Sequence, residues 1–225
     1  MRMDAAALVP AYNEAETIAD VVRGVLPFVS QVLVVDDGST DGTGDHARVA
    51  GASVIAHQTN QGKGTAVRTG LDHLLRGNLT HVVFLDGDLQ HLPQETPRLL
   101  DAARETEADV VIGERRFDRA RMPASRYHTN RIGSRALSWF VGVPVRDTQC
   151  GFRVFRVDVL RRMRLSATGY EIETEMLVKL RRLGGRIASA PVTAVYNGRQ
   201  SKLRPIRDTT RTCFLAVYYR FLQRL

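Results

Sequence analysis

Cysteine is scarce in this sequence of 225 residues. Only Cys150 and Cys213 occur, and neither belongs to a CxxC or Cys/His pattern. Two cysteines are too few for a disulfide framework, and their spacing gives no cysteine-based metal site. A reduced, cytoplasmic setting is the simplest interpretation, with Cys150 as a small buried residue.

Long hydrophobic runs are also absent. No segment of the sequence approaches the roughly 18 consecutive apolar residues that a membrane-spanning helix needs. Pro10, Asn13 and Glu14 interrupt the only early apolar run, so a secretory signal is not expected. These absences indicate a cytoplasmic protein that is either soluble or peripheral at the cytoplasmic face of a membrane.

Two common phosphate-binding patterns are missing as well. The sequence has a glycine-flanked lysine at Asn60–Gly64, but this segment matches neither GxxxxGK[ST] nor GxGxxG. Kinase and dehydrogenase interpretations therefore lose their support. Lys63 is instead a candidate to meet the phosphate or the sugar of a ligand.

Positive charge is in excess. The 32 lysines and arginines outnumber the 24 acidic residues, which gives a net charge of +8 and a sequence pI of about 10.1. Such a balance favours acidic partners, which include nucleotides, phospholipid surfaces and nucleic acid. The hydrophobic fraction of 44% is enough for one substantial core.

Short apolar runs alternate with amphipathic helical stretches in the first half of the chain. The runs are Ala5–Val9, Val32–Val35, Ala52–Ala56, Val82–Leu85 and Val110–Ile112. Strands that are buried on both faces and separated by helices predict an α/β fold with a Rossmann-like, mostly parallel sheet and helices on both faces. Ligands of such sheets bind beyond the carboxyl ends of the strands.

The second half of the sequence is less regular. We expect a short strand at Phe152–Phe155, a helix at Tyr170–Leu183 and an extended segment at Ile187–Tyr196. The chain is expected to divide into a main domain over residues 1–203 and an amphipathic helix over residues 204–225. That helix either docks on the domain or lies in the interface of a membrane.

The acidic segment Asp86-Gly87-Asp88 is the strongest local signal for chemistry. It follows a predicted buried strand, and its two carboxylates can face one hard divalent cation, Mg²⁺ or Mn²⁺. Gln90 offers a third, neutral oxygen. The alternative is a structural turn in which the aspartates accept hydrogen bonds from the following backbone.

Polar residues also follow the first two predicted strands. Tyr12 can stack on a nucleobase, and Asp36 or Asp37 can accept a hydrogen bond from a base or a ribose hydroxyl. The segment Asp36–Thr43 is equally typical of a turn and a helix N-cap. Both interpretations stay open.

Four of these motifs together resemble a known family, the inverting glycosyltransferases of family 2, which have the GT-A fold. The motifs are Leu8–Glu14, Val34–Ser39, Asn60–Gly64 and Asp86–Gln90. Two further segments, Asp147–Arg153 and Arg199–Lys202, resemble the dolichyl- and polyprenyl-phosphate sugar synthases of that family. The resemblance extends from about Ala5 to Asp208, so the domain over residues 1–203 is expected to be a GT-A catalytic domain.

The resemblance implies a role for each matching position. Residues that would hold the nucleotide sugar are Pro10, Tyr12, Glu14, Asp36, Asp37, Lys63, Asp86, Arg199 and Lys202. Residues that would hold the metal against the diphosphate are Asp86, Asp88 and Gln90, and those that would meet an acceptor phosphate are Arg115, Arg116, Arg131 and Ser134. The residues expected to carry catalysis are Asp88, Arg115, Arg131 and Glu173.

The chemistry of the transfer separates two kinds of acceptor. A hydroxyl acceptor needs a general base, whereas a phosphate monoester is already anionic near pH 7, with a second pKa of about 6. The basic stretch Arg115–Arg135 offers cations for such a phosphate, or forms a solvated basic face. The sequence therefore predicts hexose transfer from a UDP- or GDP-sugar to a polyprenyl or dolichyl phosphate.

Several alternatives stay open. A family 2 enzyme could act on a soluble or glycan hydroxyl with Glu173 or His91 as its base. A nucleotidyltransferase would also use carboxylates and a metal. A nucleic-acid binding module is suggested by the pI alone, without interleaved stacking aromatics. Glu171, Glu173 and Glu175 also suit the first turns of a helix for purely electrostatic reasons.

Overall fold

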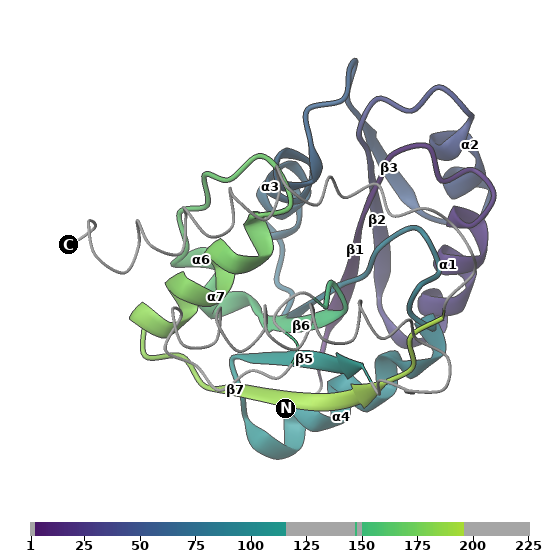
Figure 1. Cartoon of the computed structure of the whole chain (residues 1–225). Helices are drawn as coiled ribbons and strands as arrows, with labels where there is room; N and C mark the ends of the chain where they lie inside the picture. Colours follow the sequence, from purple (N-terminus) through teal and green to yellow (C-terminus); the bar gives the residue numbers. More distant parts are fainter. Residues whose placement is uncertain (1–2, 116–146, 148–149, 196–225) are drawn as a thin grey trace, which may run out of the picture.

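The computed structural model describes residues 3–115, 147 and 150–195. Within them, seven strands form a single sheet (Figure 1). The strands are β1 (Ala5–Ala11), β2 (Gln31–Asp36), β3 (Ser53–Ala56), β4 (His81–Phe84), β5 (Val110–Arg115), β6 (Arg153–Arg156) and β7 (Ile187–Val192). Every strand expected from the sequence is present in this set, within a few residues of the predicted bounds.

The helices of the described residues connect these strands. They are α1 (Ile18–Val25), α2 (Thr43–Val49), α3 (Lys63–Leu74), α4 (Thr96–Thr106), α6 (Val157–Arg161) and α7 (Ile172–Arg182), with short 3₁₀ turns η1 (Leu26–Phe28) and η2 (Pro93–Glu95). In Figure 1, α3 and α7 lie on one side of the sheet, and α1 and α2 lie on the other. The helix predicted at Tyr170–Leu183 is confirmed as α7.

The sheet has the strand order β3-β2-β1-β4-β6-β5-β7. All neighbouring pairs are parallel except those of β6, which runs antiparallel to both β4 and β5. The predicted α/β architecture with a mostly parallel sheet is therefore confirmed. The orientation of β6 places its first residue, Arg153, beside Phe84 at the carboxyl end of β4. The segment before β6 is thus brought to the edge where ligands bind.

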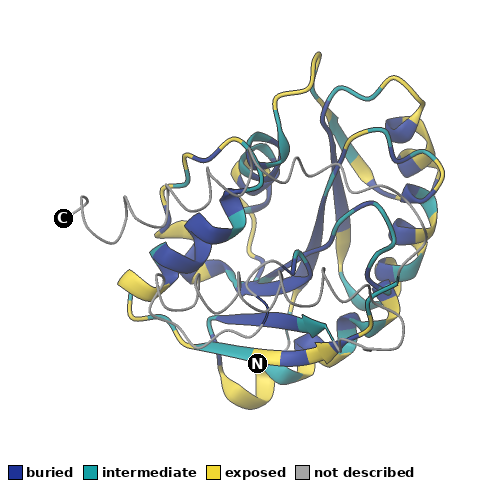
Figure 2. Ribbon diagram, in the orientation of Figure 1, coloured by how far each residue is buried: buried dark blue, intermediate teal, exposed yellow. Residues whose placement is uncertain are grey.

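The core forms because the strands are apolar on both faces and the helices on one. Leu8 of β1 lies between Leu33 and Phe84 in the sheet register, and all three are buried. Helix α1 buries its apolar stripe, including Ile18 and Val22, at 0% exposure. Figure 2 shows the central strands buried and the outer helix faces exposed. Each such large side chain contributes about 1.5–3 kcal/mol on burial.

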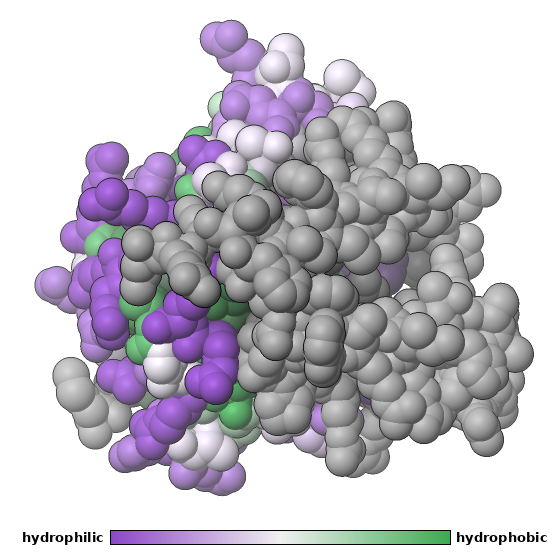
Figure 3. All heavy atoms as spheres, turned by 60° about the vertical axis from the view of Figure 1, so that its left-hand side comes forward, coloured by the Kyte–Doolittle hydropathy of each residue, from purple (hydrophilic) through white to green (hydrophobic). Residues whose placement is uncertain are grey.

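The exposed large apolar side chains of the described residues are Tyr12, Leu26 and Val49. Those described residues that are visible in Figure 3 are mostly hydrophilic, with small apolar patches between them. Among the described residues, no helix is both long enough and apolar enough to cross a membrane.

Some predicted features lie outside the described residues. They are Arg116, Arg131, Ser134, Arg199, Lys202 and the helix expected over residues 204–225. The predicted division of the chain after residue 203 lies outside them too, and it stays a prediction.

Candidate active site

The acidic loop after β4 lies where the sequence predicts it, at the carboxyl edge of the sheet. Asp88 Oδ1 accepts a hydrogen bond from the backbone N–H of Gln90 at 3.0 Å, so the turn interpretation is confirmed for Asp88, and its role as a metal ligand stays a prediction. Leu89 has a φ of 56°, which a bulky residue rarely adopts. Strained backbone of this kind concentrates at functional sites.

Hydrogen bonds from two other segments hold the backbone of the acidic loop in place. The hydroxyl of Thr17, just before α1, donates to the carbonyl of Gly87 at 2.7 Å and lies 3.4 Å from the Glu14 carboxylate. The backbone of Gln90 accepts a hydrogen bond from the N–H of Val195 at 2.9 Å. Thr17 carries no signal in the sequence, because its contact to Gly87 spans 70 residues.

The pKa values of the two aspartates are shifted in opposite directions. Burial and the like charge of Asp86 raise the pKa of Asp88 to about 6, with Glu14 adding to the effect. Burial alone would raise the pKa of Asp86, but the ammonium of Lys63 lowers it below its ordinary value. Asp88 therefore lies in a locally negative environment that a cation would relieve.

This donor set fits a hard divalent cation. Asp86 and Asp88 supply carboxylate oxygens, which Mg²⁺ and Mn²⁺ prefer. The described residues contain no group of three or more His, Cys, Asp and Glu side chains arranged around one metal position. Two carboxylates bind such an ion weakly by themselves, so phosphates of a ligand would have to complete its shell.

Lys63 lies between two carboxylates. Its ammonium is 2.7 Å from Asp86 Oδ1 and 2.6 Å from Glu173 Oε1, and it lies 5.6 Å from the centre of the Tyr170 ring. Burial would lower the pKa of Lys63, but the attraction of Asp86 and Glu173 outweighs burial and raises it above its ordinary value. Lys63 is therefore charged, and in this structure it binds protein carboxylates.

Arg153 is the second cation of this cluster and was assigned no role from the sequence. Its side chain is 2% exposed, and its Nε donates to the carbonyl of Cys150 at 2.7 Å. Its Nη1 donates to the Glu173 carbonyl at 2.9 Å, and its Nη2 lies 3.6 Å from Glu173 Oε2. Glu173 occupies the first turn of α7, as expected, and its carboxylate contacts two cations.

Glycines allow these segments to approach one another. A Cβ on Gly151 would lie 2.4 Å from Asp86 Oδ2, so only glycine fits at that position without moving the carboxylate. A Cβ on Gly64 would lie 2.5 Å from the carbonyl oxygen of Ala167, and the Gly64 N–H donates to the carbonyl of Thr168 at 2.9 Å. Close packing against the backbone of residues 167–168 therefore favours glycine at position 64.

The loops after β1 and β2 are bound to each other. The N–H of Asn13 donates to Ser39 Oγ at 2.9 Å, and Asn13 Oδ1 accepts from the N–H of Thr40 at 2.9 Å. The N–H of Glu14 donates to Thr43 Oγ1 at 2.8 Å. Tyr12, which directly follows β1, is 37% exposed, and its stacking on a nucleobase stays a prediction.

Asp36 and Asp37 have different surroundings. Asp36 Oδ1 accepts from the N–H of Ser39 at 3.0 Å. Asp37 accepts hydrogen bonds from His57 Nδ1 at 2.7 Å and from two backbone N–H groups, those of Gln61 at 2.9 Å and Gly62 at 2.7 Å. Asp37 thus positions the turn that leads into Lys63, a role the sequence analysis did not assign to it. Its predicted contact with the nucleoside stays a prediction.

Arg115 lies at the end of β5 and makes a bidentate ion pair. Its Nε and Nη2 donate to the two oxygens of Asp147 at 2.6 and 2.8 Å, and Asp147 is 1% exposed. The pair orients the guanidinium at the same edge of the sheet. Asp147 belongs to a motif that the sequence analysis recognised without assigning it this partner.

His91 and Cys150 are buried side by side, with His91 Nε2 3.5 Å from Cys150 Sγ. Burial, and then the nearby Asp147 carboxylate, raise the pKa of the Cys150 thiol to about 12, so it is not a nucleophile. The prediction of a small buried residue is confirmed. Burial also lowers the pKa of His91, which is therefore neutral near pH 7.

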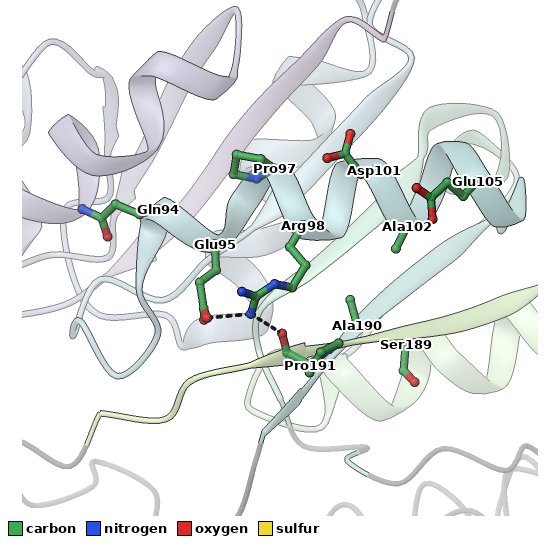
Figure 4. A pocket seen from close by; sticks show the side chains of 10 residues that line it. All are labelled: Gln94, Glu95, Pro97, Arg98, Asp101, Ala102, Glu105, Ser189, Ala190 and Pro191. Atoms are coloured by element: carbon green, nitrogen blue, oxygen red, sulfur yellow. Dashed lines mark hydrogen bonds and ion pairs between the residues drawn. The ribbon is translucent and has the colours of Figure 1, made fainter.

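A surface hollow lies away from these residues, between α4 and β7. It has a volume of about 560 Å³, and Figure 4 shows Arg98 within it, bound to Glu95 and to the carbonyl of Pro191. None of the predicted site residues lines this hollow. We therefore place the active site at the end of β4, where the carboxylates and cations converge.

Comparison with known proteins identifies the family of the chain and agrees with its fold. The family model described as Glycosyl transferase family 2 matches residues 6–164. The chain therefore belongs to glycosyltransferase family 2 and is a glycosyltransferase. Membership favours this interpretation over a nucleotidyltransferase or a nucleic-acid binding module.

Two characterised relatives cover most of the chain. It is 38% identical to glycosyltransferase AglJ of Haloferax volcanii over 95% of this chain and 70% of that protein. It is 37% identical to undecaprenyl-phosphate mannosyltransferase of Micrococcus luteus over 84% of this chain and 82% of that protein. The resemblance to polyprenyl-phosphate sugar synthases is therefore confirmed.

Solved structures confirm the GT-A fold. Mannosyl-3-phosphoglycerate synthase from Rubrobacter xylanophilus superposes with a TM-score of 0.79 at 23% identity, over 99% of this chain and 77% of that one. Glucosyl-3-phosphoglycerate synthase from Mycobacterium tuberculosis, in complex with Mn²⁺ and UDP-glucose, gives 0.77 at 24% identity, over 97% and 79%. At this identity the likeness concerns the fold alone.

Proposed function

We propose that this glycosyltransferase moves a hexose from a UDP- or GDP-sugar to a polyprenyl phosphate, with inversion at the anomeric carbon. The observation that carries the proposal is the convergence of Asp86, Asp88, Lys63 and Arg153 at the carboxyl edge of the sheet. The relatives named for transfer to undecaprenyl phosphate and for polyprenol monophosphomannose synthesis support the lipid acceptor.

On the donor side, we assign the nucleoside to the loops after β1 and β2. Tyr12 is exposed and can stack on the base, and Asp36 can accept from the ribose or the base. Pro10 and Glu14 shape the same loop, and Asp37 holds the turn before Lys63. Arg199 and Lys202, outside the described residues, are proposed to contact the donor.

The diphosphate is assigned to the acidic loop. Asp86 and Asp88, with Gln90 as a third oxygen donor, would hold Mg²⁺ or Mn²⁺ there. A bound divalent ion would stabilise the negative charge that develops on the leaving diphosphate. Thr17 holds the backbone of this loop, and Lys63 and the N–H of Gln90 orient the carboxylates of Asp86 and Asp88 in the absence of the donor.

We assign a phosphate acceptor because, unlike a hydroxyl, it needs no general base. Glu173 contacts two cations, Lys63 and Arg153, so its carboxylate is poorly placed to take a proton from a hydroxyl. His91 is buried against Cys150. A phosphate acceptor is already anionic and needs cations only. Asp147 orients the Arg115 guanidinium, which we propose contacts the acceptor phosphate. Arg116, Arg131 and Ser134 are proposed to complete the acceptor site.

A donor panel tests this proposal. The protein is incubated with Mn²⁺, a short polyprenyl phosphate, a soluble oligosaccharide and each of several UDP- and GDP-hexoses, and the product is identified by mass. We expect one donor to give a glycosylated polyprenyl phosphate, and Asp88→Asn to abolish its formation. Failure of every donor to modify the lipid phosphate, with transfer to a soluble hydroxyl instead, would establish the alternative acceptor class.

Association with a membrane surface is a separate part of the proposal. The net charge of +8 attracts the protein to an anionic leaflet, at about 1 kcal/mol for each basic residue near the surface. Binding should therefore weaken as salt shortens the screening length. Sedimentation with anionic and neutral vesicles at low and high salt measures this, and equal binding to both vesicle types would contradict it.

A further inference from the structure

We infer that Lys63 is an internal competitor of the divalent cation, which makes metal binding depend on the nucleotide. This inference rests on the proposed metal site at Asp86 and Asp88. It concerns a different property, the order in which metal and nucleotide bind.

The Lys63 ammonium contacts the carboxylate that the proposed metal ion would bind. Lys63 Nζ lies 2.7 Å from Oδ1 of Asp86, the carboxylate that a divalent ion would share. The side chain is 15% exposed, so water screens this pair only weakly. A cation that binds Asp86 must therefore displace Lys63 from it or accept its repulsion.

Lys63 also has a second carboxylate partner within reach. Glu173 Oε1 lies 2.6 Å from the same ammonium, and Arg153 holds Glu173 from the other side. Lys63 can therefore leave Asp86 and stay paired with Glu173. Lys63 and Arg153 offset the formal charges of Asp86 and Glu173, so the net charge of these groups and Asp88 together is a single negative one, and this lowers their attraction for a further cation.

Hydrogen bonds on both sides of Lys63 fix its backbone. Asp37 accepts from the N–H of Gly62 at 2.7 Å, and the N–H of Gly64 donates to Thr168 at 2.9 Å. The ammonium can swing on its side chain, but its Cα cannot withdraw from the acidic loop. The positive charge therefore stays within side-chain reach of the proposed metal position when the ammonium leaves Asp86.

These features couple the two ligands. A nucleotide diphosphate brings negative charge that offsets the repulsion from Lys63 and supplies oxygens for the ion. Metal and nucleotide should then bind with positive coupling, which is reciprocal by linkage. Removing the lysine charge should raise the metal affinity of the nucleotide-free protein and reduce the coupling.

The test measures Mn²⁺ binding without substrate turnover. Free Mn²⁺ is titrated by electron paramagnetic resonance against the full chain, with and without UDP or GDP. We expect Lys63→Met to bind Mn²⁺ alone roughly ten-fold more tightly than wild type, because one nearby positive charge is removed. Lys63→Arg should bind as weakly as wild type. Adding Asp86→Asn to Lys63→Met should abolish the gain.

Two variants control for charge and folding. Arg23→Met removes one exposed positive charge on α1 and should leave Mn²⁺ binding unchanged. Lys63→Gln keeps a hydrogen-bond donor for Asp86 without the charge, and it replaces Lys63→Met if circular dichroism shows that the methionine variant is unfolded.

The outcomes separate this inference from the proposed function. If Mn²⁺ binds wild type with nucleotide, but the neutral variants bind Mn²⁺ alone no more tightly than wild type, the competition is refuted and the metal site stands. If neither wild type nor the neutral variants bind Mn²⁺ under any condition, the metal assignment fails and this inference fails with it.

Discussion

Replacing Gly151 by alanine tests whether the position of Asp86 controls activity. The added Cβ would lie 2.4 Å from Asp86 Oδ2, whereas ordinary contact begins at 3.4 Å. The carboxylate therefore has to move by about 1 Å, and Lys63, now 2.7 Å from its other oxygen, loses that contact. A misplacement of about 1 Å in a catalytic group can lower the rate about 100-fold.

The stability of this variant should change less than its activity. The clash is with the tip of a side chain, and overpacking of this kind costs about 1–3 kcal/mol. We expect kcat to fall about 100-fold and Mn²⁺ affinity with nucleotide to fall as well, with a folded circular dichroism spectrum. Turnover and Mn²⁺ titration of the purified variant measure both.

Gly77→Ala is the matched control. A Cβ there would lie 3.6 Å from the carbonyl oxygen of Leu74, which is ordinary contact, so turnover should be unchanged. A Gly151→Ala enzyme whose turnover stays within about three-fold of wild type would refute the reasoning, because Asp86 would then tolerate a displacement the account forbids.

Other predictions concern stability and metal removal. Burial would raise the pKa of Glu175, but hydrogen bonds from Lys179, Ala167 and Ser166 lower it, so its stabilisation is present above its unfolded pKa and is lost on acidification. Glu175→Gln should therefore cost about 1–3 kcal/mol at pH 7, and the difference in melting temperature should shrink below about pH 5; a constant difference would contradict this. Arg153→Met should cost about 1–3 kcal/mol in urea unfolding, because the carbonyls of Cys150 and Glu173 lose their buried donor while Glu173 keeps Lys63, and an unchanged midpoint would contradict this. EDTA should abolish turnover and added Mn²⁺ should restore it, whereas turnover that survives EDTA would exclude the metal site.

Much of the fold could be predicted because its signals are local. The apolar runs at Ala5–Val9 and Val82–Leu85 identify strands by their composition and by the turn residues that follow them. Asp86 and Asp88 lie directly after such a strand, so the topology alone places them at the binding edge. The expected position of Glu173 in the first turn of α7 follows equally from local sequence.

The partners of these residues could not be predicted, because they are distant in sequence. Lys63 and Glu173 are 110 residues apart, and no periodicity shows that they meet. The antiparallel direction of β6, which brings Gly151 and Arg153 to Asp86, also leaves no mark in a strand of four residues. The Gly64 position was interpreted as part of a ligand loop, and its close packing on residues 167–168 appears only in three dimensions.

The central claim is that the sugar passes to a lipid phosphate at this metal-binding edge. The most direct measurement offers the enzyme equal concentrations of polyprenyl phosphate and free polyprenol, together with its sugar donor and Mn²⁺, and counts the two products by mass spectrometry. The account predicts glycosylated polyprenyl phosphate only, with no product from Asp88→Asn. Transfer to the free alcohol at a comparable rate, or full activity of Asp88→Asn, would contradict it.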